Sequence, residues 1–381
     1  MKIIGLIAEY NPLHLGHLYQ IKKIKEQYPN SLIILITNSC FTQRGDITIL
    51  TRNDKTKIAL DNQIDLIVEL PFAYATQSAD IFAYGALKIL NTLKIDTLIF
   101  GSETNNIEEI TKIANTQLNN KEYDKLVKQY LSTGINYPTA LNKALSQINN
   151  KAIKEPNDLL ALSYIKEIIK NKYPIIPISI KRIGSYHEKE VKNEFANASL
   201  IREKLLNHQS IDKYIPKNEK ELLIKDFSLN NYFDYLKYKI ISTPDLSIYQ
   251  TVDEGIDNKI KKEIQNCSTW EELILKIKSK RYTYNKINRM LVHILTSFSK
   301  EEPKKIKIDY IKILGFNIKG QKYLNSIKKE INLPIIYNYK KNTSLLLDIE
   351  QRAITIYNLK IPTIKQINEY KQKPIIKTDA Q

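Results

Sequence analysis

Short apolar runs alternate with amphipathic stretches over the first two hundred residues of the chain. The apolar runs, each typical of a buried strand, cover Ile3–Ala8, Leu32–Thr37, Ile64–Leu70, Thr97–Phe100 and Ile175–Ile180. The stretches of helical period between them include Leu15–Tyr28, Arg52–Asn62 and Ala79–Leu93. This alternation predicts an α/β fold, a Rossmann-like parallel sheet with helices on both faces. Ligands of such sheets bind beyond the carboxyl ends of the strands.

The pattern changes twice further along the chain. Residues 105–172 have mostly helical period, which predicts an insertion before the last strand. After about residue 207 few strand signals remain, and helical period covers Asn218–Tyr238, Glu271–Lys278, Lys286–Ser299 and Lys322–Glu330. Pro216 and the polar run PKNEKE favour a boundary nearby. We expect two domains, residues 1–207 with the sheet and residues 208–381 mainly α-helical and basic, because 381 residues exceed the usual size of one core.

Composition agrees with an ordinary globular protein. Hydrophobic residues make up 43% and charged residues 26% of the chain. No run approaches the roughly 18 apolar residues of a membrane span, and the opening MKIIGLIAEYNP reads as a first strand. We therefore expect a cytoplasmic protein without a membrane partner. The two cysteines, Cys40 and Cys267, exclude a disulfide framework and a zinc site, and no metal-ligating residues are predicted.

The charge of the chain indicates a polyanionic partner. Lysine and arginine number 58 against 41 acidic residues, which gives a net charge of +17. An excess of this size is typical of proteins that bind nucleic acid. The chain is also rich in Lys, Ile, Asn and Tyr, as a coding bias toward A and T would produce, so part of the excess has a second explanation.

The segment AEYNPLHLGH, residues 8–17, joins the first predicted strand to the first predicted helix. Asn11 is expected to cap this helix and Pro12 to occupy its first position. His14 and His17 then lie three residues apart on one face of the first turn, and Gly16 lets a ligand approach the backbone. Free amides and the positive helix end favour an anion, so two imidazole donors there predict a phosphate site. The alternative is a pair of histidines half-buried against the sheet.

Other nucleotide-binding motifs are absent from the sequence. No two glycines stand two apart, which excludes G-x-G-x-x-G. The stretch GFNIKGQK at 315–322 lacks the Lys-Ser/Thr ending of a P-loop and follows no clear strand. The phosphate-site hypothesis therefore depends on H-x-G-H.

A strand followed by H-x-G-H resembles the nucleotidylyltransferase superfamily, which includes the class I aminoacyl-tRNA synthetases. Within it, IAEYNPLHLGHLYQ (7–20) resembles the tRNA(Met) cytidine acetate ligase family. Further motifs of that family follow in order: FTQRGD (41–46), DLIVELPFAYATQSADIFAYGA (65–86), FGSE (100–103), EPNDLLALSYIK (155–166), KRIGSYHE (181–188), NASLIR (197–202) and KSKRYTYNKINRML (278–291). Leu13 and Leu15 stand where the family often has Phe and Asn.

The resemblance implies an enzyme that activates acetate with ATP, as acetyl-adenylate, and passes the acetyl group to N4 of the wobble cytidine of elongator tRNA(Met). Mg²⁺ is expected to accompany ATP. By the same resemblance, the residues that contact ATP are Ile7, Ala8, Glu9, Tyr10, Asn11, Pro12, Leu13, His14, Leu15, Gly16, His17, Leu18, Tyr19, Gln20, Gly101, Asn157 and Arg182. His14, His17 and Arg182 are the expected catalytic residues, which align the reactants and stabilise charge.

Several of these residues also have a position that suits the role. Arg182 follows the last predicted strand, where a guanidinium can hold a triphosphate in forked geometry; the alternative is a surface arginine. Gly101 ends a strand and either admits a base or ribose or simply makes a turn. Asn157 opens a helix after Pro156, so that free amides face the nucleotide or are merely capped. His187 is either a site residue or a solvated loop histidine.

Two further motifs supply candidates for phosphate and substrate. NASLIR resembles the S-T/S-x-I-R element of adenylyl transferases, in which Ser199 and Arg202 would contact phosphate, although capping by Asn197 also explains the motif. Gln43 and Arg44 follow the second strand and are expected to position acetate or the target base. Cys40 is close in sequence, but no motif supplies the base that a thioester mechanism needs.

The stretch KRYTYNKINRM interleaves cations with tyrosines near the start of a predicted helix. Lys280, Arg281 and Arg289 are expected to bind tRNA phosphates, and Tyr282 to stack on bases of the single-stranded anticodon loop. The alternative is a solvated helix start with packed tyrosines. Two other functions remain open, a small-molecule adenylyl transferase and an RNA-binding protein whose catalytic site has lapsed.

Overall fold

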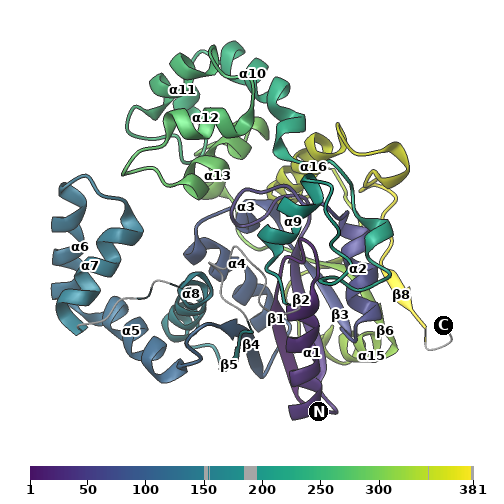
Figure 1. Ribbon diagram of the computed structural model, residues 1–381. Coiled ribbons are helices and arrows are strands. Elements are labelled where there is room, and N and C mark those ends of the chain that lie inside the picture. The colour runs from purple at the N-terminus through teal and green to yellow at the C-terminus, as the bar shows by residue number, and fades with distance from the viewer. Residues whose placement is uncertain (150–152, 154, 184–194, 342, 379–381) are drawn as a thin grey trace.

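The computed structural model describes residues 1–149, 153, 155–183, 195–341 and 343–378 (Figure 1). A sheet with the strand order β5-β4-β1-β2-β3-β6-β7 lies at its centre, and β8 pairs with β6. The strands are β1 (Ile3–Ile7), β2 (Leu32–Asn38), β3 (Leu66–Leu70), β4 (Thr97–Ser102), β5 (Ile176–Lys181), β6 (Ile311–Asn317), β7 (Ile335–Ile336) and β8 (Ile375–Lys377). Strands β1 to β5 are parallel to one another, which confirms the predicted fold class.

Helices cover both faces of this sheet. Alternate residues of β2 enter two separate hydrophobic cores, Leu32 and Ile34 on one face and Ile33 and Leu35 on the other. The helices of the first two hundred residues are α1 (Leu15–Gln27), α2 (Arg52–Asp61), α3 (Phe72–Ala75), α4 (Ala79–Thr92), α5 (Ile107–Asn119), α6 (Lys121–Ser132), α7 (Tyr137–Asn149) and α8 (Pro156–Asn171). The helical insertion predicted for 105–172 thus contains α5 to α8 before β5.

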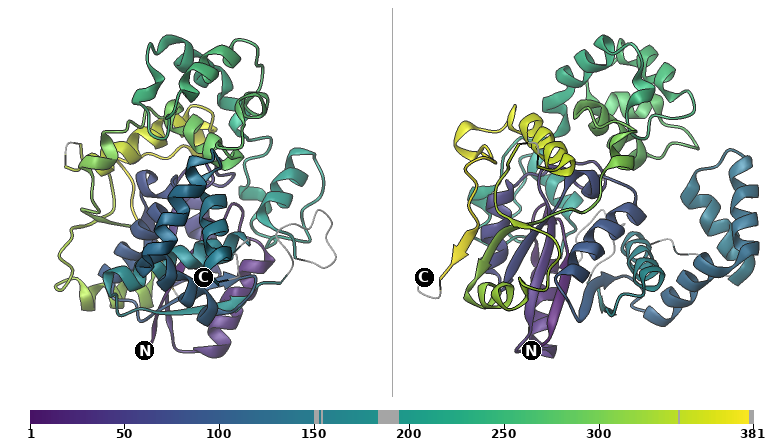
Figure 2. Two further views of the ribbon diagram at one scale, coloured as in Figure 1. Left: turned by 90° about the vertical axis from the view of Figure 1, so that its left-hand side faces the viewer. Right: turned by 180° about the vertical axis from the view of Figure 1, so that it is seen from behind.

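The rest of the described chain is mainly helical. Its helices are α9 (Ala198–Leu206), α10 (Phe233–Ser242), α11 (Ile256–Ile264), α12 (Trp270–Ile277), α13 (Tyr284–Leu295), α14 (Glu302–Lys305), α15 (Ile318–Ile327) and α16 (Leu345–Asn358). Short 3-10 turns occupy Lys220–Leu222, Leu229–Tyr232, Leu246–Ile248 and Thr363–Lys365. Helices α10 to α13 form a cluster at one end of the molecule, while α5 to α7 extend to one side (Figures 1 and 2). No helix in the described ranges has the length and apolar character needed to cross a bilayer.

The sheet differs from the expectation on one point. Strand β6 runs antiparallel beside β3 and carries β8 on its other side, so the last third of the chain adds strands to the sheet of the first third. The stretch GFNIKGQK begins inside β6 and runs into the first turns of α15, so a strand does lie there, contrary to expectation. The division of the chain into two domains near residue 207 stays a prediction. Under that division, β6 and β8 of the second domain would belong to the sheet of the first domain.

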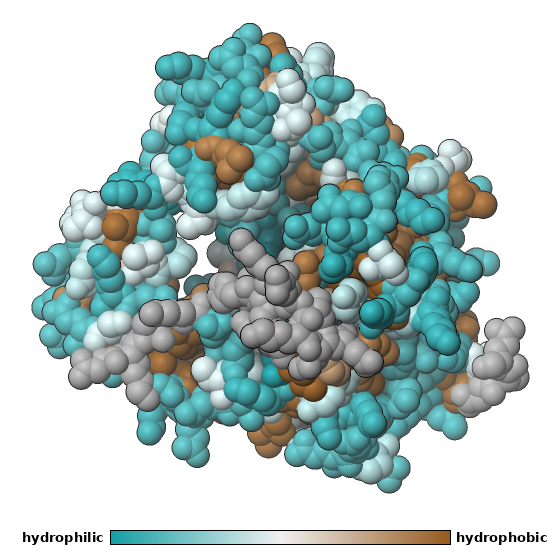
Figure 3. All heavy atoms as spheres, in the orientation of Figure 1, coloured by the Kyte–Doolittle hydropathy of each residue, from teal (hydrophilic) through white to brown (hydrophobic). Residues whose placement is uncertain are grey.

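The arm of α5 to α7 returns to the helical cluster. Asn136, between α6 and α7, donates through Nδ2 to the carbonyl of Lys280, in the loop between α12 and α13 (3.0 Å). Figure 3 shows the surface hollowed between this arm and the cluster. The carboxyl ends of the parallel strands and the helical cluster thus lie on the same side of the molecule (Figure 1).

Candidate active site

Helix α1 begins at Leu15, because His14 is its N-cap. The ring of His14 accepts a hydrogen bond through Nδ1 from the Gly16 amide (3.1 Å). The expectation that Asn11 caps the helix and that Pro12 opens it is wrong. The Asn11 amide instead bonds the carbonyl of Ile47 (3.0 Å) and the amide of Ile49 (2.9 Å), so this side chain fixes the loop that follows β2.

His14 and His17 lie on one face of the first turn, as predicted. Their rings stack with centroids 3.8 Å apart and planes 23° apart. The amide of His14 donates to Nδ1 of His17 (3.2 Å), which completes a reciprocal cap. Because Nδ1 of each ring accepts a backbone N–H, we assign the ring proton to Nε2 in both. The pair therefore offers two Nε2–H donors.

Both rings are held neutral by their surroundings. Burial, and after it the Arg182 cation, lowers the pKa of His14 to about 3. Burial, the His14 ring and Arg182 together bring the pKa of His17 well below its ordinary value. At neutral pH the pair acts on an anion as hydrogen-bond donors, without the charge of an imidazolium.

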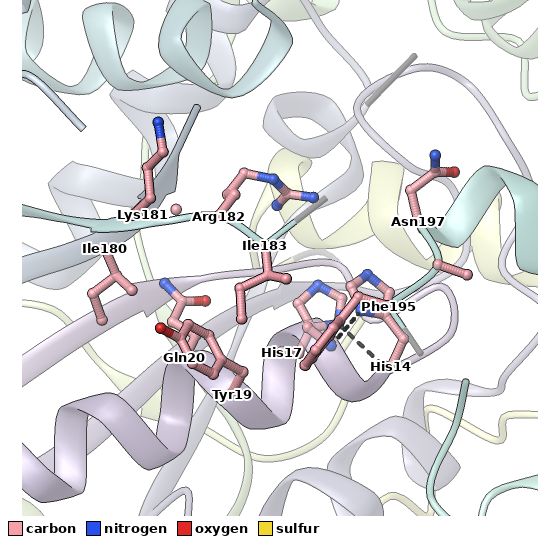
Figure 4. Close-up of a pocket in the computed structure, with 13 residues that line it drawn as sticks. His14, His17, Tyr19, Gln20, Ile180, Lys181, Arg182, Ile183, Phe195 and Asn197 are labelled. Carbon is pink, nitrogen blue, oxygen red and sulfur yellow. Dashed lines mark hydrogen bonds between the residues drawn. The ribbon is translucent and has the colours of Figure 1, made fainter. Parts of the chain in front are cut away.

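Two adjoining cavities of about 530 and 1130 Å³ open at these rings. The residues that line both are His14, His17, Gln20, Gly101, Arg182 and Asn197. Figure 4 shows the smaller cavity, with Arg182 above the two histidines. From the predicted segment 7–20, the walls contain Ile7, Ala8, Glu9, Tyr10, Asn11, His14, Gly16, His17, Tyr19 and Gln20. Pro12, Leu13, Leu15 and Leu18 line neither cavity.

Gly101 and Arg182 are coupled by close packing. A Cβ at Gly101 would lie 3.1 Å from Cγ of Arg182, so a glycine at the end of β4 lets the arginine side chain cross it. The Arg182 amide donates to the carbonyl of Ser102 (3.0 Å) and continues the β4–β5 pairing. Its Nε is buried and has no hydrogen-bond partner among the described residues. The structure therefore places a cation with unused donor capacity over the cleft.

Asn157 lines the larger cavity, but the amides at the start of α8 are not free for a ligand. The Glu103 carboxylate accepts from the amides of Asn157 (3.4 Å) and Asp158 (3.1 Å) and from Nδ2 of Asn157 (2.5 Å). The structure therefore shows the capped helix, while the contact between Asn157 and ATP stays a prediction. The sequence offered one signal for Glu103, its place in FGSE two residues after Gly101.

Ser199 and Arg202 face the larger cavity from α9. Arg202 donates to the carbonyl of Asn11 (2.8 Å) and to the Asp46 carboxylate (2.8 Å). Asn197 caps the helix by accepting from the Leu200 amide (2.9 Å). Capping therefore explains part of NASLIR, while the predicted phosphate contact stays a prediction.

The loop after β2 brings Gln43 and Arg44 to the larger cavity, on the side predicted from the sequence. The backbone amide of Gln43 donates to Oε1 of Glu9 (2.6 Å). Glu9 lies two residues beyond the end of β1. Gly45 has φ +82°, and a Cβ there would lie 2.7 Å from the backbone nitrogen of Arg289. The loop thus packs directly against the backbone of α13.

Cys40 is part of the hydrophobic core, 3% exposed, with its sulfur 3.3 Å from the Ser39 hydroxyl. Burial raises the pKa of this thiol, so a thiolate nucleophile is not available at neutral pH. The described residues contain no group of three or more metal-ligating side chains. His187 lies outside the described residues.

The four residues predicted to bind RNA differ in their surroundings. Arg289 lines neither cavity but contacts the loop that does, because its Nη1 donates to the carbonyl of Gln43 (3.2 Å), and burial lowers its pKa to about 10. Lys280 and Arg281 are exposed in the loop before α13, and Arg281 pairs with Glu254 (3.0 Å).

The expectation that Tyr282 stacks on a base does not fit the structure. The side chain is only 5% exposed, and its hydroxyl donates to the carbonyl of Asp253 (2.5 Å). The Nζ of Lys286 lies 4.3 Å from the ring centroid and covers one face. Tyr282 packs the loop between α12 and α13, as the alternative reading of this motif held.

Comparison with known proteins places this fold and cleft in a family. A family model described as HIGH Nucleotidyl Transferase matches residues 1–373. The tRNA(Met) cytidine acetate ligase of Caldicellulosiruptor saccharolyticus is 36% identical over 98% of each chain, and that of Bacillus subtilis is 34% identical over 98% of this chain and 97% of the relative. The chain belongs to the tRNA(Met) cytidine acetate ligase family.

Solved structures of this family share the whole architecture. The apo crystal structure of Thermotoga maritima TmcAL superposes with a TM-score of 0.91 at 25% identity, over 99% of this chain and 100% of that one. The same Thermotoga protein bound to α-thio ATP gives a TM-score of 0.88 at 26% identity over the same shares. In this member of the tRNA(Met) cytidine acetate ligase family, the paired histidines and Arg182 meet in one cleft at the head of α1.

Proposed function

We propose that the protein is an ATP-dependent ligase that activates acetate as acetyl-adenylate and transfers the acetyl group to N4 of the wobble cytidine of elongator tRNA(Met). The observation that carries the proposal is the cleft at the head of α1, where two neutral Nε2–H donors and the Arg182 cation converge. A family relative crystallised with α-thio ATP supports ATP as the nucleotide. The reactants belong to the cytoplasm, where we place the protein.

In the first step a carboxylate oxygen of acetate attacks the α-phosphorus of ATP, and the bond to the β-phosphate breaks, releasing pyrophosphate. Negative charge increases on the phosphate oxygens, and fixed donors stabilise it: His14 and His17 through Nε2–H, and Arg182 through its guanidinium. No enzyme nucleophile is needed, which agrees with the buried thiol of Cys40. Mg²⁺ would be held chiefly by the triphosphate oxygens.

In the second step the exocyclic amine of the cytidine attacks the acetyl carbonyl. The nitrogen–carbon bond forms, the carbon–oxygen bond to AMP breaks, and AMP leaves. The tRNA would lie along the side of the cleft that carries Arg44 and continue to the exposed cations Lys280 and Arg281. Phosphate contacts of this kind fix position, while the cleft selects the reacting base.

The test uses the full-length protein with ATP, labelled acetate and tRNA(Met). We expect mass analysis of the digested tRNA to show N4-acetylcytidine, and the same tRNA with uridine at the wobble position to stay unmodified. Without tRNA, the protein should catalyse pyrophosphate exchange into ATP that depends on acetate. Exchange that depends on a mononucleotide acceptor instead would identify a small-molecule adenylyl transferase. Absence of both exchange and acetylation would contradict the proposal.

A further inference from the structure

Glu9 lies in the larger of the two cavities, which it shares with the paired histidines. It follows β1 by two residues and lines the larger cavity but not the smaller one. The other residues that line the larger cavity alone include Gln43, Arg44, Phe82, Phe100, Leu160 and Tyr164. This compartment, which we call the Glu9 compartment, therefore combines the Glu9 carboxylate with polar groups of the loop after β2, among them Asp46, which is paired with Arg202, and with an apolar wall.

The carboxylate of Glu9 is held at one oxygen and unbonded at the other. Oε1 accepts from the Gln43 amide (2.6 Å), and within the described residues no hydrogen bond reaches Oε2. The backbone is fixed as well, because the buried Lys55 ammonium lies 3.4 Å from the Glu9 carbonyl and 2.6 Å from that of Asn38. Glu9 thus has a defined place and one oxygen available to a ligand.

The surroundings of Glu9, burial above all, raise its affinity for a proton. Burial raises the pKa of Glu9 to about 7, although the Gln43 amide, Lys55 and Arg44 favour the carboxylate. Asp46, in the same loop as Arg44, acts in the opposite direction. A carboxylate with this pKa accepts a proton near neutral pH far better than an ordinary surface glutamate does.

The apolar wall of the compartment is mainly aromatic. Phe82, Phe100 and Tyr164 are buried, and the rings of Phe100 and Tyr164 lie 5.8 Å apart at 53°. Unpaired bases of RNA stack on aromatic side chains, and a carboxylate accepts from the N4 amine of cytosine. The compartment therefore presents an aromatic wall and an acceptor suited to a nucleobase that carries an exocyclic amine.

We propose that Glu9 receives the proton released when the exocyclic amine of the target base attacks acetyl-adenylate. The amine nitrogen forms the bond to the carbonyl carbon, the bond from that carbon to the AMP oxygen breaks, and one N–H proton moves to Oε2 of Glu9. The proton returns to solvent after AMP and the acetylated tRNA leave. This inference rests on the proposed function and names the base that its second step needs.

The experiment separates the two half-reactions in the full-length enzyme. In Glu9→Gln, single-turnover transfer from preformed acetyl-adenylate to tRNA should fall by about 10²-fold or more, a loss at least about tenfold greater than that of acetate-dependent pyrophosphate exchange. Glu9→Asp should recover part of the transfer rate. Glu203→Gln, which removes an exposed carboxylate from α9, is the matched control and should change neither half-reaction.

The pH dependence provides a second readout. Since the base acts when ionised, the wild-type transfer rate should rise with pH through about 7 and then level off, and the Glu9→Gln rate should be flat over the same range. Equal losses of exchange and transfer in Glu9→Gln would assign Glu9 to the ATP or acetate site and overturn the proposal. So would undiminished transfer in Glu9→Gln or, should that variant fail to fold, a wild-type transfer rate independent of pH. Absence of acetate-dependent exchange in the wild type would instead refute the proposed function.

Discussion

His14 combines a structural and a chemical role in one side chain. Its Nδ1 caps α1, and this same bond directs the ring proton to Nε2 at the cleft. Spacing alone predicts that His14 and His17 share a face, because three residues make nearly one helical turn. The exact start of the helix could not be predicted, since the Asn11 side chain forms its hydrogen bonds with Ile47 and Ile49 in the loop after β2 and not with the helix.

Two substitutions at His14 separate these roles. Asparagine is a good N-cap and keeps an acceptor for the Gly16 amide, whereas alanine does not. We expect His14→Asn and His14→Ala both to lower acetate-dependent pyrophosphate exchange by about 10²-fold or more, because each loses an Nε2–H donor. His14→Ala should in addition lose about 1 kcal/mol of unfolding free energy in urea. Affinity for tRNA should stay unchanged in both variants, and full exchange activity in His14→Asn would show that the ring proton is dispensable.

At the scale of elements, the contact that matters most to the site is the one between the loop after β2 and α13. Asn288 donates through Nδ2 to the Arg44 carbonyl (3.2 Å) and to the Asp46 carboxylate (3.1 Å). Asn288 is itself fixed by Nε1 of Trp270 (2.8 Å). Helix α13 therefore connects the exposed cations of its own N-terminal loop to the residues that line the cleft.

Gly45→Ala tests this contact. Its Cβ would meet the backbone of α13 at 2.7 Å, and the φ of +82° is strained for alanine. We expect transfer to tRNA to fall at least about tenfold, with a loss of about 1–3 kcal/mol in unfolding free energy. Gly255→Ala is the matched control, because Gly255 has φ +78° but no atom within 4 Å of an added Cβ. If both variants transfer acetyl equally well, the packing of this loop on α13 has no part in the reaction.

The elements also show how far sequence patterns predict a structure of this kind. The five parallel strands and helices α1, α2 and α4 were predicted to within about two residues at each end, because strong periodicity is local information, whereas α5 to α8 were predicted only as one helical stretch. β6 was missed because its charged Lys312 interrupts the apolar pattern; in the fold this side chain is fully buried beside Glu69 and Glu369. The occupied amides at α8 and the buried ring of Tyr282 stood only as alternatives for a related reason, since their partners Glu103 and Asp253 could not be paired with them before the fold was known.

At the scale of the whole molecule, a buried ion network joins the two ends of the chain. Arg52 on α2 pairs with Glu69 on β3 (2.7 Å) and with Glu369, which also pairs with Lys312 on β6. All four side chains are at most 1% exposed. Removing one member of such a network leaves a buried charge without a partner, and this costs far more than losing a surface pair.

Glu369→Gln should therefore lower the unfolding free energy by about 3–5 kcal/mol. Glu330→Gln is the control, because Glu330 pairs with Lys94 at the surface, where both side chains are roughly half exposed, and it should change stability little. Urea unfolding followed by circular dichroism measures both. Equal stabilities of the two variants would show that the network contributes no more than a surface pair.

The electrostatics of the whole molecule give the last prediction, which concerns tRNA. Lys280 and Arg281 are exposed in the loop that contacts Asn136 of the α5–α7 arm. We expect the double substitution Lys280→Ala and Arg281→Ala to weaken tRNA binding and to reduce the slope of log affinity against log salt by about 1–2, since each phosphate contact releases about one counterion. Lys328→Ala with Lys329→Ala removes the same charge from exposed positions after α15, at the opposite end of the sheet (Figure 1), and should leave that slope unchanged. Filter binding over a salt series measures both slopes, and equal slopes would place the RNA surface elsewhere on the protein.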